Sequence, residues 1–315
     1  MPQQPDAVSR LVAADTPQSQ QTVGNPMIAE RRISVAGIGT SYYEKGTGHP
    51  ILCLHGASPG MIWDARLSWI RQLHGLSDQF RVIALDQLQF GGTDNPAPPG
   101  QYINRLGRVD HVIGFIEAMG LKGITLVGNS EGSFVAARVA IVRPDLVFRL
   151  VLLTGNSSSP PFGDERDKTW MDANEKEYYS DLGKPMPTEE GFIREGDAAG
   201  GHDPFEAELK EYRRIAYRRP QTRERWKILK NAPEEETNTR LYVTLQQRYI
   251  IPYLDRLQPQ TLIIWSKDDP IVPPDNGFRL AKLIRNSEFH LLRGGHGLHH
   301  QQSDAVNRLI RYWHG

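Results

Sequence analysis

Residues 124–137 read ITLVGNSEGSFVAA, an apolar run typical of a strand, then the pattern Gly-X-Ser-X-Gly, then a run typical of a helix. A strand that turns abruptly into a helix holds Ser130 in a strained backbone conformation, and side chains at Gly128 and Gly132 would collide with neighbouring backbone. The hydroxyl of Ser130 then lies near a helix N-terminus, where backbone N–H groups favour developing negative charge. The pattern therefore predicts a nucleophilic serine on a tight turn.

Short apolar runs alternate with helical patterns on both sides of this stretch, which indicates a mostly parallel sheet flanked by helices. No convincing strand lies between Leu153 and Thr261, a span too long for an ordinary loop. We therefore expect an α/β fold with an eight-stranded sheet and a helical cap insertion. Strands are expected at 32–35, 40–44, 51–54, 81–85, 124–127, 150–153, 261–265 and 288–292, and core helices at 62–73, 105–119, 131–142, 275–284 and 303–313.

The chain is expected to divide into a tail, a core in two parts and the cap. Its first 25 residues are rich in Gln, Ser, Pro and Ala and lack the basic start and apolar centre of a secretory signal. A disordered tail is expected over residues 1–28. The core is expected over 29–155 and 251–315, with the cap over 156–250.

A serine nucleophile needs a base, and the base needs an orienting acid. In strand–turn–helix sites of this kind, the chain order is serine, acid, histidine. Residues 261–273 read TLIIWSKDDPIVP, a strand followed by Asp268 and Asp269, and residues 288–297 read EFHLLRGGHG, a strand followed by His296. Either aspartate can supply the acid. Strand ends of a parallel sheet meet at one edge, where such sheets bind ligands, so these groups are expected beside Ser130.

Acyl chemistry also needs two N–H donors aimed at the developing oxyanion. Glu131, the residue after the serine, is expected to supply one of them. Residues 54–60 read LHGASPG, a strand and a small-residue loop, from which Ala57 is expected to supply the other. The alternative is that His55 and Gly56 form only a turn. The sequence leaves open whether the Glu131 carboxylate points toward the site.

Composition excludes several other classes of protein. The 315 residues are 39% hydrophobic and carry 37 basic and 37 acidic side chains, so the net charge is zero. A nucleic-acid binder is normally basic overall, and a disordered chain is less apolar. The single cysteine, Cys53, excludes a disulfide framework, and its place in an apolar run indicates a buried thiol. Because a secretory signal is not recognised, we expect a cytoplasmic protein. No stretch approaches the roughly 18 consecutive apolar residues of a membrane helix.

Three histidines near the C-terminus raise the possibility of a metal site. His296, His299 and His300 have a spacing similar to that of a helical metal pair. No carboxylate or thiol completes the ligand set, so a polar start to the last helix is the simpler interpretation. We expect neither a metal ion nor any other cofactor.

The motifs together resemble the α/β-hydrolase family, from about Arg31 onward. In relatives the acid commonly lies four residues before a proline, as Asp269 does before Pro273 and Asp268 does not. The resemblance implies the α/β-hydrolase fold and a triad of Ser130, His296 and Asp269. The motifs in the family's order are His55-Gly56, Asp86 with residues 91–94 (GGTD), the turn at Ser130, Asp269, and Gly295-His296.

Within that family, the chain most resembles the meta-cleavage-product hydrolases, which split carbon–carbon bonds in dienoate ketones from aromatic-ring degradation. The resemblance rests on residues 55–60 (HGASPG), on Asp86-Gln87 and on Asn129. It implies that Asn129 and a cap arginine, matched here to Arg213, bind the substrate carboxylate.

Ser58 and His55, in the matched loop, are the remaining candidate substrate-binding residues. The sequence departs from the family at three positions. Ser58 replaces a glycine, Gly297 follows the histidine where an aromatic residue is usual, and Glu131 stands where an apolar residue is usual.

The leading hypothesis is a cofactor-independent serine hydrolase that acts on a small anionic carbonyl compound. Carbon–carbon hydrolysis of a dienoate ketone is the first choice, and an ester or lactone is the alternative. A second class is a lyase, a cyclase or a ligand-binding protein on the same fold. We expect no nucleic-acid or membrane partner, and a homodimer is compatible with the sequence.

Charge is segregated within the expected cap. Residues 164–211 hold 15 acidic and 6 basic side chains, whereas residues 213–230 hold 8 basic and 1 acidic. The basic segment has two functional interpretations, a polyanion-binding surface or an arm over Ser130 that suits a small anionic substrate. A solvated helix face is the common structural alternative.

Overall fold

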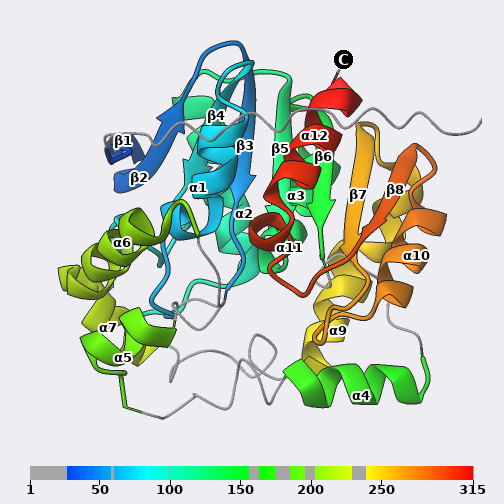
Figure 1. Ribbon diagram of the computed structural model, residues 1–315. Coiled ribbons are helices and arrows are strands. Elements are labelled where there is room, and N and C mark those ends of the chain that lie inside the picture. The colour runs from blue at the N-terminus through cyan, green and yellow to red at the C-terminus, as the bar shows by residue number, and fades with distance from the viewer. Residues whose placement is uncertain are drawn as a thin grey trace, which may run out of the picture.

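The computed structural model confirms the eight-stranded, mostly parallel sheet (Figure 1). The strands are β1 (Arg31–Val35), β2 (Ile38–Lys45), β3 (His49–Leu54), β4 (Phe80–Leu85), β5 (Ile124–Asn129), β6 (Val147–Leu153), β7 (Gln260–Ser266) and β8 (Ser287–Leu292). Their spatial order is β1-β2-β4-β3-β5-β6-β7-β8. Strand β2 is antiparallel to β1 and β4, and the other neighbours are parallel. The structure describes residues 27–57, 60–98, 100–155, 163–174, 185–195, 203–228 and 239–314.

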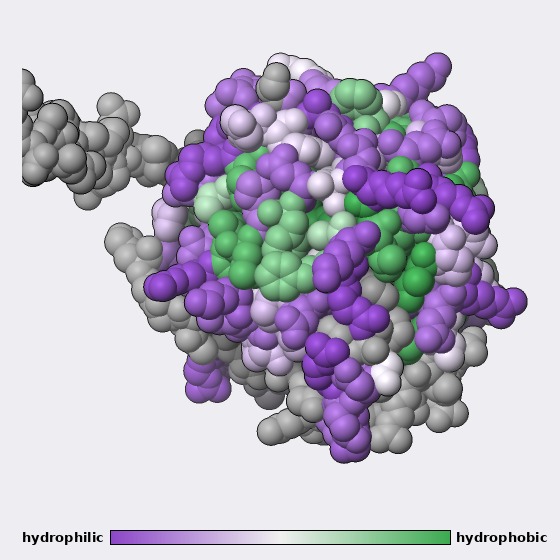
Figure 2. All heavy atoms as spheres, turned by 90° about the vertical axis from the view of Figure 1, so that its right-hand side faces the viewer, coloured by the Kyte–Doolittle hydropathy of each residue, from purple (hydrophilic) through white to green (hydrophobic). Residues whose placement is uncertain are grey.

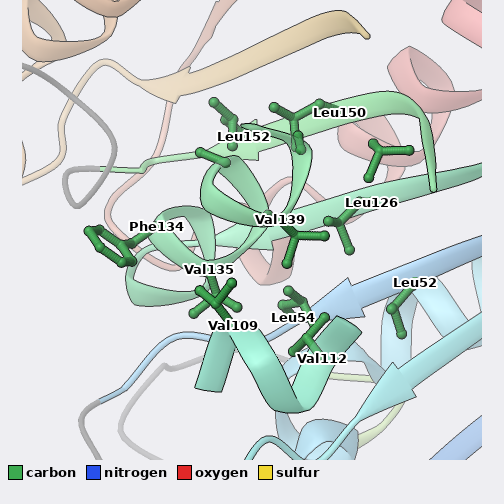
Figure 3. Close-up of a cluster of buried hydrophobic side chains, with 14 of the residues drawn as sticks. Leu52, Leu54, Val109, Val112, Leu126, Phe134, Val135, Val139, Leu150 and Leu152 are labelled. Atoms are coloured by element: carbon green, nitrogen blue, oxygen red, sulfur yellow. The ribbon is translucent and has the colours of Figure 1, made fainter. Parts of the chain in front are cut away.

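Helices cover both faces of the sheet, which explains why its central strands are apolar on both sides. Helices α2 (Arg105–Ala118), α3 (Glu131–Val142) and α10 (Pro274–Leu283) pack on one face. Helices α1 (Ala65–Gly75), α11 (Leu298–Gln301) and α12 (Ser303–His314) pack on the other. Figure 3 shows Val112 of α2 and Val135 of α3 beside Leu54 of β3 on the first face.

Helix α1 begins later than expected, and helix α11 is an additional helix. Helix α1 begins at Ala65 rather than Ile62, because the carboxylate of Asp64 accepts hydrogen bonds from the backbone N–H groups of Arg66 and Leu67 and caps the helix. The four-residue helix α11 was not expected, because one turn is too short to produce a periodic pattern.

The described residues between β6 and β7 contain helices and no strand. They are α4 (Glu165–Asn174), α5 (Glu189–Glu195), α6 (Glu206–Arg218), α7 (Pro220–Ile228) and α9 (Thr239–Tyr249), followed by the 3-10 helix η5 (Ile251–Arg256). Figure 1 shows α4, α5 and α7 beyond the ends toward which the parallel strands point. Helix α6 packs on α1 through Tyr212 and Ala216, which join a buried cluster with Leu67 and Ile70.

Ile28, at the end of the tail that the sequence predicts to be disordered, is ordered against the core. Its side chain is buried, and its N–H donates to the hydroxyl of Tyr212 on α6 over 2.8 Å. Cys53 is buried as expected, and burial raises the pKa of its thiol. Among the residues that the structure describes, no helix is both long enough and apolar enough to cross a membrane.

Candidate active site

Ser130 lies at a sharp turn between β5 and α3. Its backbone angles, φ 50° and ψ −120°, are unfavourable for a side-chain-bearing residue. A Cβ at Gly132 would lie 2.3 Å from the carbonyl oxygen of Leu54, and a Cβ at Gly128 would lie 2.5 Å from that of Gly132. Both contacts are impossible for any residue except glycine, so the two glycines allow the turn that exposes the serine hydroxyl at the helix N-terminus.

The structure brings Ser130, His296 and Asp269 together. His296 Nε2 lies 2.9 Å from Ser130 Oγ, and His296 Nδ1 lies 2.9 Å from Asp269 Oδ2. The other carboxylate oxygen of Asp269 accepts hydrogen bonds from the N–H groups of Ile271 and Val272, at 2.8 and 2.9 Å. These bonds fix the carboxylate, so its direction toward His296 does not depend on His296 itself.

Asp268 lies outside this line of contacts. Its carboxylate accepts a 3.4 Å hydrogen bond from the N–H of Gly294, and its own N–H donates to the carbonyl of the same glycine. Asp268 therefore joins the loops after β7 and β8, whereas Asp269 contacts the histidine.

The loop after β3 passes directly against the serine. A Cβ at Gly56 would lie 3.0 Å from Ser130 Cβ. Ala57, the next residue, has φ 77°, a left-handed conformation that is costly for alanine. The strained backbone at Ala57 is therefore next to the strained backbone at Ser130. Ser58, a candidate substrate-binding residue, lies outside the described residues.

His55 does not occupy the position expected of a substrate-binding residue. Its ring is fully buried, with Nε2 accepting from the N–H of Gln87 and Nδ1 lying 2.7 Å from the carbonyl of Gly56. Because Nε2 is an acceptor, Nδ1 carries the proton and donates to Gly56. Burial lowers the pKa of His55 to about 4. The neutral ring of His55, with both nitrogens bonded to backbone groups, therefore holds the loop after β3 in place.

Asn129 also differs from its expected role. Its side-chain Nδ2 donates to Thr154 Oγ1 over 3.0 Å and to the carbonyl of Leu153 over 3.4 Å. Both amide hydrogens are therefore used within the protein, which removes them as donors to a carboxylate. Thr154 in turn donates to the carbonyl of His296. Sequence reasoning missed Thr154, whose signal was its place directly after a buried strand, beside the histidine loop.

Arg213, on α6, lies near the segment that follows His296. Its charge is one cause that lowers the pKa of His300 to about 3, after burial and the charge of Arg71. Arg71 Nη1 lies 2.9 Å from His300 Nδ1, and Arg71 also pairs with Asp203. The charges of Arg71 and Arg213 therefore both act on the histidine loop, and Asp203 balances that of Arg71. Among the described residues, no group of three or more His, Cys, Asp or Glu side chains is arranged to hold a metal ion.

Many arginines of the basic segment at 213–230 are paired, so the described part of the segment is not one continuous basic surface. Arg219 is mostly buried and donates to Glu30, Tyr43 and Asp64. Arg225 is buried and donates to the carbonyls of Gly91 and Thr93. Arg214 pairs with Glu211 and Arg218 with Glu189. Arg213 donates to the carbonyl of Ile193 on α5 over 3.4 Å, and its charge acts on His300.

The Glu131 carboxylate, whose direction the sequence left open, points to α2. Arg105 Nε donates to Glu131 Oε2 over 3.0 Å, and Arg108 Nη2 lies 3.7 Å from Glu131 Oε1. Sequence reasoning missed both arginines. Their signal was a spacing of three residues that places them on the same helix face as Val109 and Val112, the face that packs on the sheet.

Comparisons with known proteins identify the family of the fold. The family model described as alpha/beta hydrolase fold matches residues 49–302. A 2-hydroxymuconate semialdehyde hydrolase of Pseudomonas sp. (strain CF600) is 29% identical over 88% of each chain. A 2-hydroxy-6-oxo-2,4-heptadienoate hydrolase of Pseudomonas putida is 28% identical over 89% of this chain and 94% of the relative.

Solved structures agree as well. A meta-cleavage product hydrolase from Pseudomonas fluorescens IP01, a mutant complexed with acetates, superimposes with a TM-score of 0.69 at 28% identity, covering 90% of this chain and 96% of the other. A thermophilic esterase from Thermogutta terrifontis, at 23% identity and a TM-score of 0.61 over 90% of this chain and 97% of the other, shares the fold. The family match covers most of the chain, and the chain belongs to the α/β-hydrolase family.

Proposed function

We propose that this protein is a cofactor-independent serine hydrolase with Ser130 as nucleophile, His296 as base and Asp269 as the orienting acid. The observation that carries the proposal is the continuous line of contacts from Ser130 Oγ through the His296 ring to Asp269, with both contacts at 2.9 Å. A nucleophile bonded to a base that is itself bonded to a fixed acid defines this class of site by geometry. The turn at Ser130 adds a helix N-terminus at the same place.

The proposed reaction begins when Ser130 Oγ attacks a carbonyl carbon and its proton passes to His296 Nε2. The amides of Ala57 and Glu131 hold the resulting oxyanion. When the oxyanion collapses, the bond to the departing group breaks, and that group takes the bonding electron pair and the proton from His296. Water, activated by the same histidine, then releases the acyl group from Ser130 as a carboxylic acid.

For the substrate we propose a dienoate ketone of the meta-cleavage type, so that the broken bond is a carbon–carbon bond. Two relatives and one solved structure with 28–29% identity carry names of this activity. Before the bond breaks, the proton of the 2-hydroxyl group moves to the carbon next to the ketone, which gives a 2-oxo-enoate with a saturated carbon at the scissile bond. The bonding electron pair is then delocalised into the 2-oxo-enoate, which departs as a dienolate and takes the proton of His296 on its 2-oxygen. The charge of Arg213, which acts on His300 after the histidine loop, supports an anionic group in this substrate. A small ester or lactone is the alternative, because the same triad and donors serve it.

Substitution of the nucleophile tests this function. We expect Ser130→Ala to lower kcat by at least three orders of magnitude and to abolish labelling by a fluorophosphonate, with the melting temperature retained. Ser34→Ala, at an exposed serine of β1, is the matched control and should keep activity and labelling. Turnover that survives in Ser130→Ala would show that another group does the chemistry.

We also propose that the protein acts in the cytoplasm as a homodimer. The single buried cysteine fits a reducing compartment. Figure 2 shows apolar side chains gathered on the face of β8 and α10, where Phe278 is 44% and Leu291 39% exposed. Antiparallel pairing of two copies about Phe289 would set Glu288 opposite His290 of the second copy.

Light scattering after size exclusion tests the dimer. We expect twice the mass of the single chain at micromolar concentration, and the mass of one chain for Leu291→Glu. Tyr312→Glu, at an 81% exposed position of α12, should leave the mass unchanged. A parent protein with the mass of a single chain would remove this proposal without touching the chemistry.

A further inference from the structure

The residue after the nucleophile carries a carboxylate that two buried arginines surround. Glu131 is 8% exposed, Arg105 is 1% exposed and Arg108 is fully buried. Arg105 contacts both carboxylate oxygens of Glu131, and Arg108 lies 3.7 Å from one of them. The N–H of Glu131 is one of the two proposed oxyanion donors. The same residue therefore carries a negative side chain and the amide that would bind the developing negative charge.

Arg108 differs from Arg105 in its hydrogen bonds. None of its three guanidinium nitrogens has a hydrogen-bond acceptor among the described residues. Its charge also acts on His55, where it helps burial to lower the pKa against the opposing effect of the Gly56 hydrogen bond. Arg108 is therefore close to both segments that flank Ser130, the end of β3 and the start of α3.

The charges in this cluster do not cancel. Two guanidinium groups, which stay protonated in proteins, face one carboxylate, so a positive charge is left over in a buried place. A buried cation that shares its one carboxylate with a second cation and makes no hydrogen bond to a described residue lowers stability, so fold stability does not explain Arg108. A positive charge behind an oxyanion hole stabilises the transition state, because it is fixed before the negative charge develops. It also counters the carboxylate of Glu131, which alone would repel an oxyanion.

We propose that Arg108 is an electrostatic positioning residue, whose charge offsets the carboxylate of Glu131 and supports the oxyanion bound at the Glu131 amide. Arg105 holds that carboxylate away from the reacting atoms. The inference rests on the proposed serine-hydrolase function and adds a specificity to it: the site favours reactions that build negative charge at the carbonyl oxygen. A purely structural ion pair between α2 and α3 is the competing explanation.

Three variants separate the two explanations. Arg108→Met removes the charge without orphaning a hydrogen-bond acceptor, Arg108→Lys keeps the charge, and Glu131→Gln removes the opposing charge while keeping the amide. The rate constant for fluorophosphonate labelling of Ser130 is the main readout, because it follows one step that places negative charge in the oxyanion hole. The kcat and KM of ester or ketone turnover and the melting temperature are measured beside it.

We expect Arg108→Met to label about tenfold more slowly, with kcat reduced to match, KM within threefold of the parent and no fall in melting temperature. Arg108→Lys should recover the labelling rate to within about threefold, and Glu131→Gln should label two- to threefold faster despite a lower melting temperature. Removal of the positive charge thus lowers the labelling rate, and removal of the negative charge raises it. If the ion pair were only structural, removal of either charge would lower the labelling rate.

A labelling rate for Arg108→Met within twofold of the parent would overturn the inference. The inference would also be overturned if Arg108→Lys lost as much of the labelling rate as Arg108→Met. A labelling rate that falls in Glu131→Gln as well as in Arg108→Met would overturn it too. Failure of the proposed function has a different signature, since the parent protein itself would then neither label at Ser130 nor turn over either substrate.

Discussion

Both carboxylate oxygens of Asp269 have fixed partners, and one of these partners is the ring of His296. Its side chain has no exposed surface, and its two oxygens divide between the backbone of Ile271 and Val272 and the ring of His296. A carboxylate fixed in this way selects the tautomer with the proton on Nδ1 of His296, which leaves Nε2 free to accept the proton of Ser130. Asp268, one residue away, contacts only the Gly294 loop in the described hydrogen bonds.

We therefore predict that Asp269→Asn and Asp268→Asn behave differently. Asp269→Asn should lower kcat by about three orders of magnitude, because an amide NH2 facing His296 favours the wrong tautomer. Asp268→Asn is the matched control and should change kcat by less than about fivefold. Steady-state turnover of a p-nitrophenyl ester measures both. A larger loss in Asp268→Asn would reassign the acid.

The triad residues are predictable from sequence because each follows a strand and stands in a short local motif. Side-chain direction is not predictable in the same way. Asn129 turns to Thr154, and Glu131 turns to Arg105. Each of these partners comes from an element distant in sequence, so only the packed structure decides where the polar groups find hydrogen bonds.

Arg225, one of the buried side chains of helix α7, bonds the helix to the core. Arg225 donates from Nη1 to the carbonyl of Gly91 over 2.7 Å, from Nη2 to that of Thr93, and from Nε to Asn95 over 2.6 Å. Burial lowers the pKa of Arg225 to about 10, the desolvation penalty outweighing the nearby carboxylates. The guanidinium remains protonated at neutral pH and satisfies three acceptors in the loop after β4.

Removal of this guanidinium should loosen the helix. We predict that Arg225→Met lowers the free energy of unfolding by about 2–4 kcal/mol, because the acceptors of Gly91, Thr93 and Asn95 lose their partner. Arg223→Met, at an exposed position of the same helix, should change it by less than about 0.5 kcal/mol. Urea unfolding measures both. Equal losses in the two variants would mean that Arg225 holds nothing specific.

Strands and long helices follow from apolar periodicity, and all eight strands lie where their runs predict. The basic segment shows the limit of such reasoning. Arg219 and Arg225 have the same sequence signature as solvated arginines, but both are buried against the core. Charge composition alone does not distinguish an exposed basic helix from one that docks through its arginines, because the acceptors lie over a hundred residues away.

A buried polar network joins the sheet, α1 and the helices between β6 and β7. Tyr43 of β2 donates toward Asp64 and Asp86, and Arg219, which follows α6, reaches Tyr43, Asp64 and Glu30. Asp86 also accepts hydrogen bonds from the N–H groups of Ala65 and Gly92. Burial and the charge of Asp64 raise the pKa of Asp86 to about 6, whereas Arg66 and Arg219 overcome burial and lower the pKa of Asp64.

The raised pKa of Asp86 predicts a pH dependence of stability. The folded protein binds this proton more tightly than the unfolded chain, whose carboxyl has the ordinary value of 3.8, so the contribution of Asp86 to the free energy of unfolding falls as pH rises from about 4 to 6. Relative to the parent, Asp86→Asn should therefore gain about 1–3 kcal/mol between pH 4 and pH 7. Asp110→Asn, exposed on α2, should show no such gain. Parallel stability curves for the parent and Asp86→Asn would contradict this assignment.

The zero net charge of the chain arises from segments that neutralise one another across the molecule. Arg218 of α6 pairs with Glu189 of α5, and Arg71 of α1 pairs with Asp203. The sequence shows the segregation of charge but not these pairings, which depend on how the helices beyond β6 fold back on the core. Beside the histidine loop, Asp203 balances the charge of Arg71, and the charge of Arg213 also acts on His300.

The bond that the enzyme breaks is tested most directly by comparing kcat/KM for a 2-hydroxy-6-oxo-dienoate ketone and for a p-nitrophenyl ester on the same purified protein. Loss of the dienoate chromophore and release of nitrophenolate follow the two reactions. We predict a kcat/KM at least tenfold higher for the dienoate, and loss of both activities in Ser130→Ala. Turnover of the ester with none of the dienoate, or dienoate turnover that survives in Ser130→Ala, would contradict the proposed chemistry.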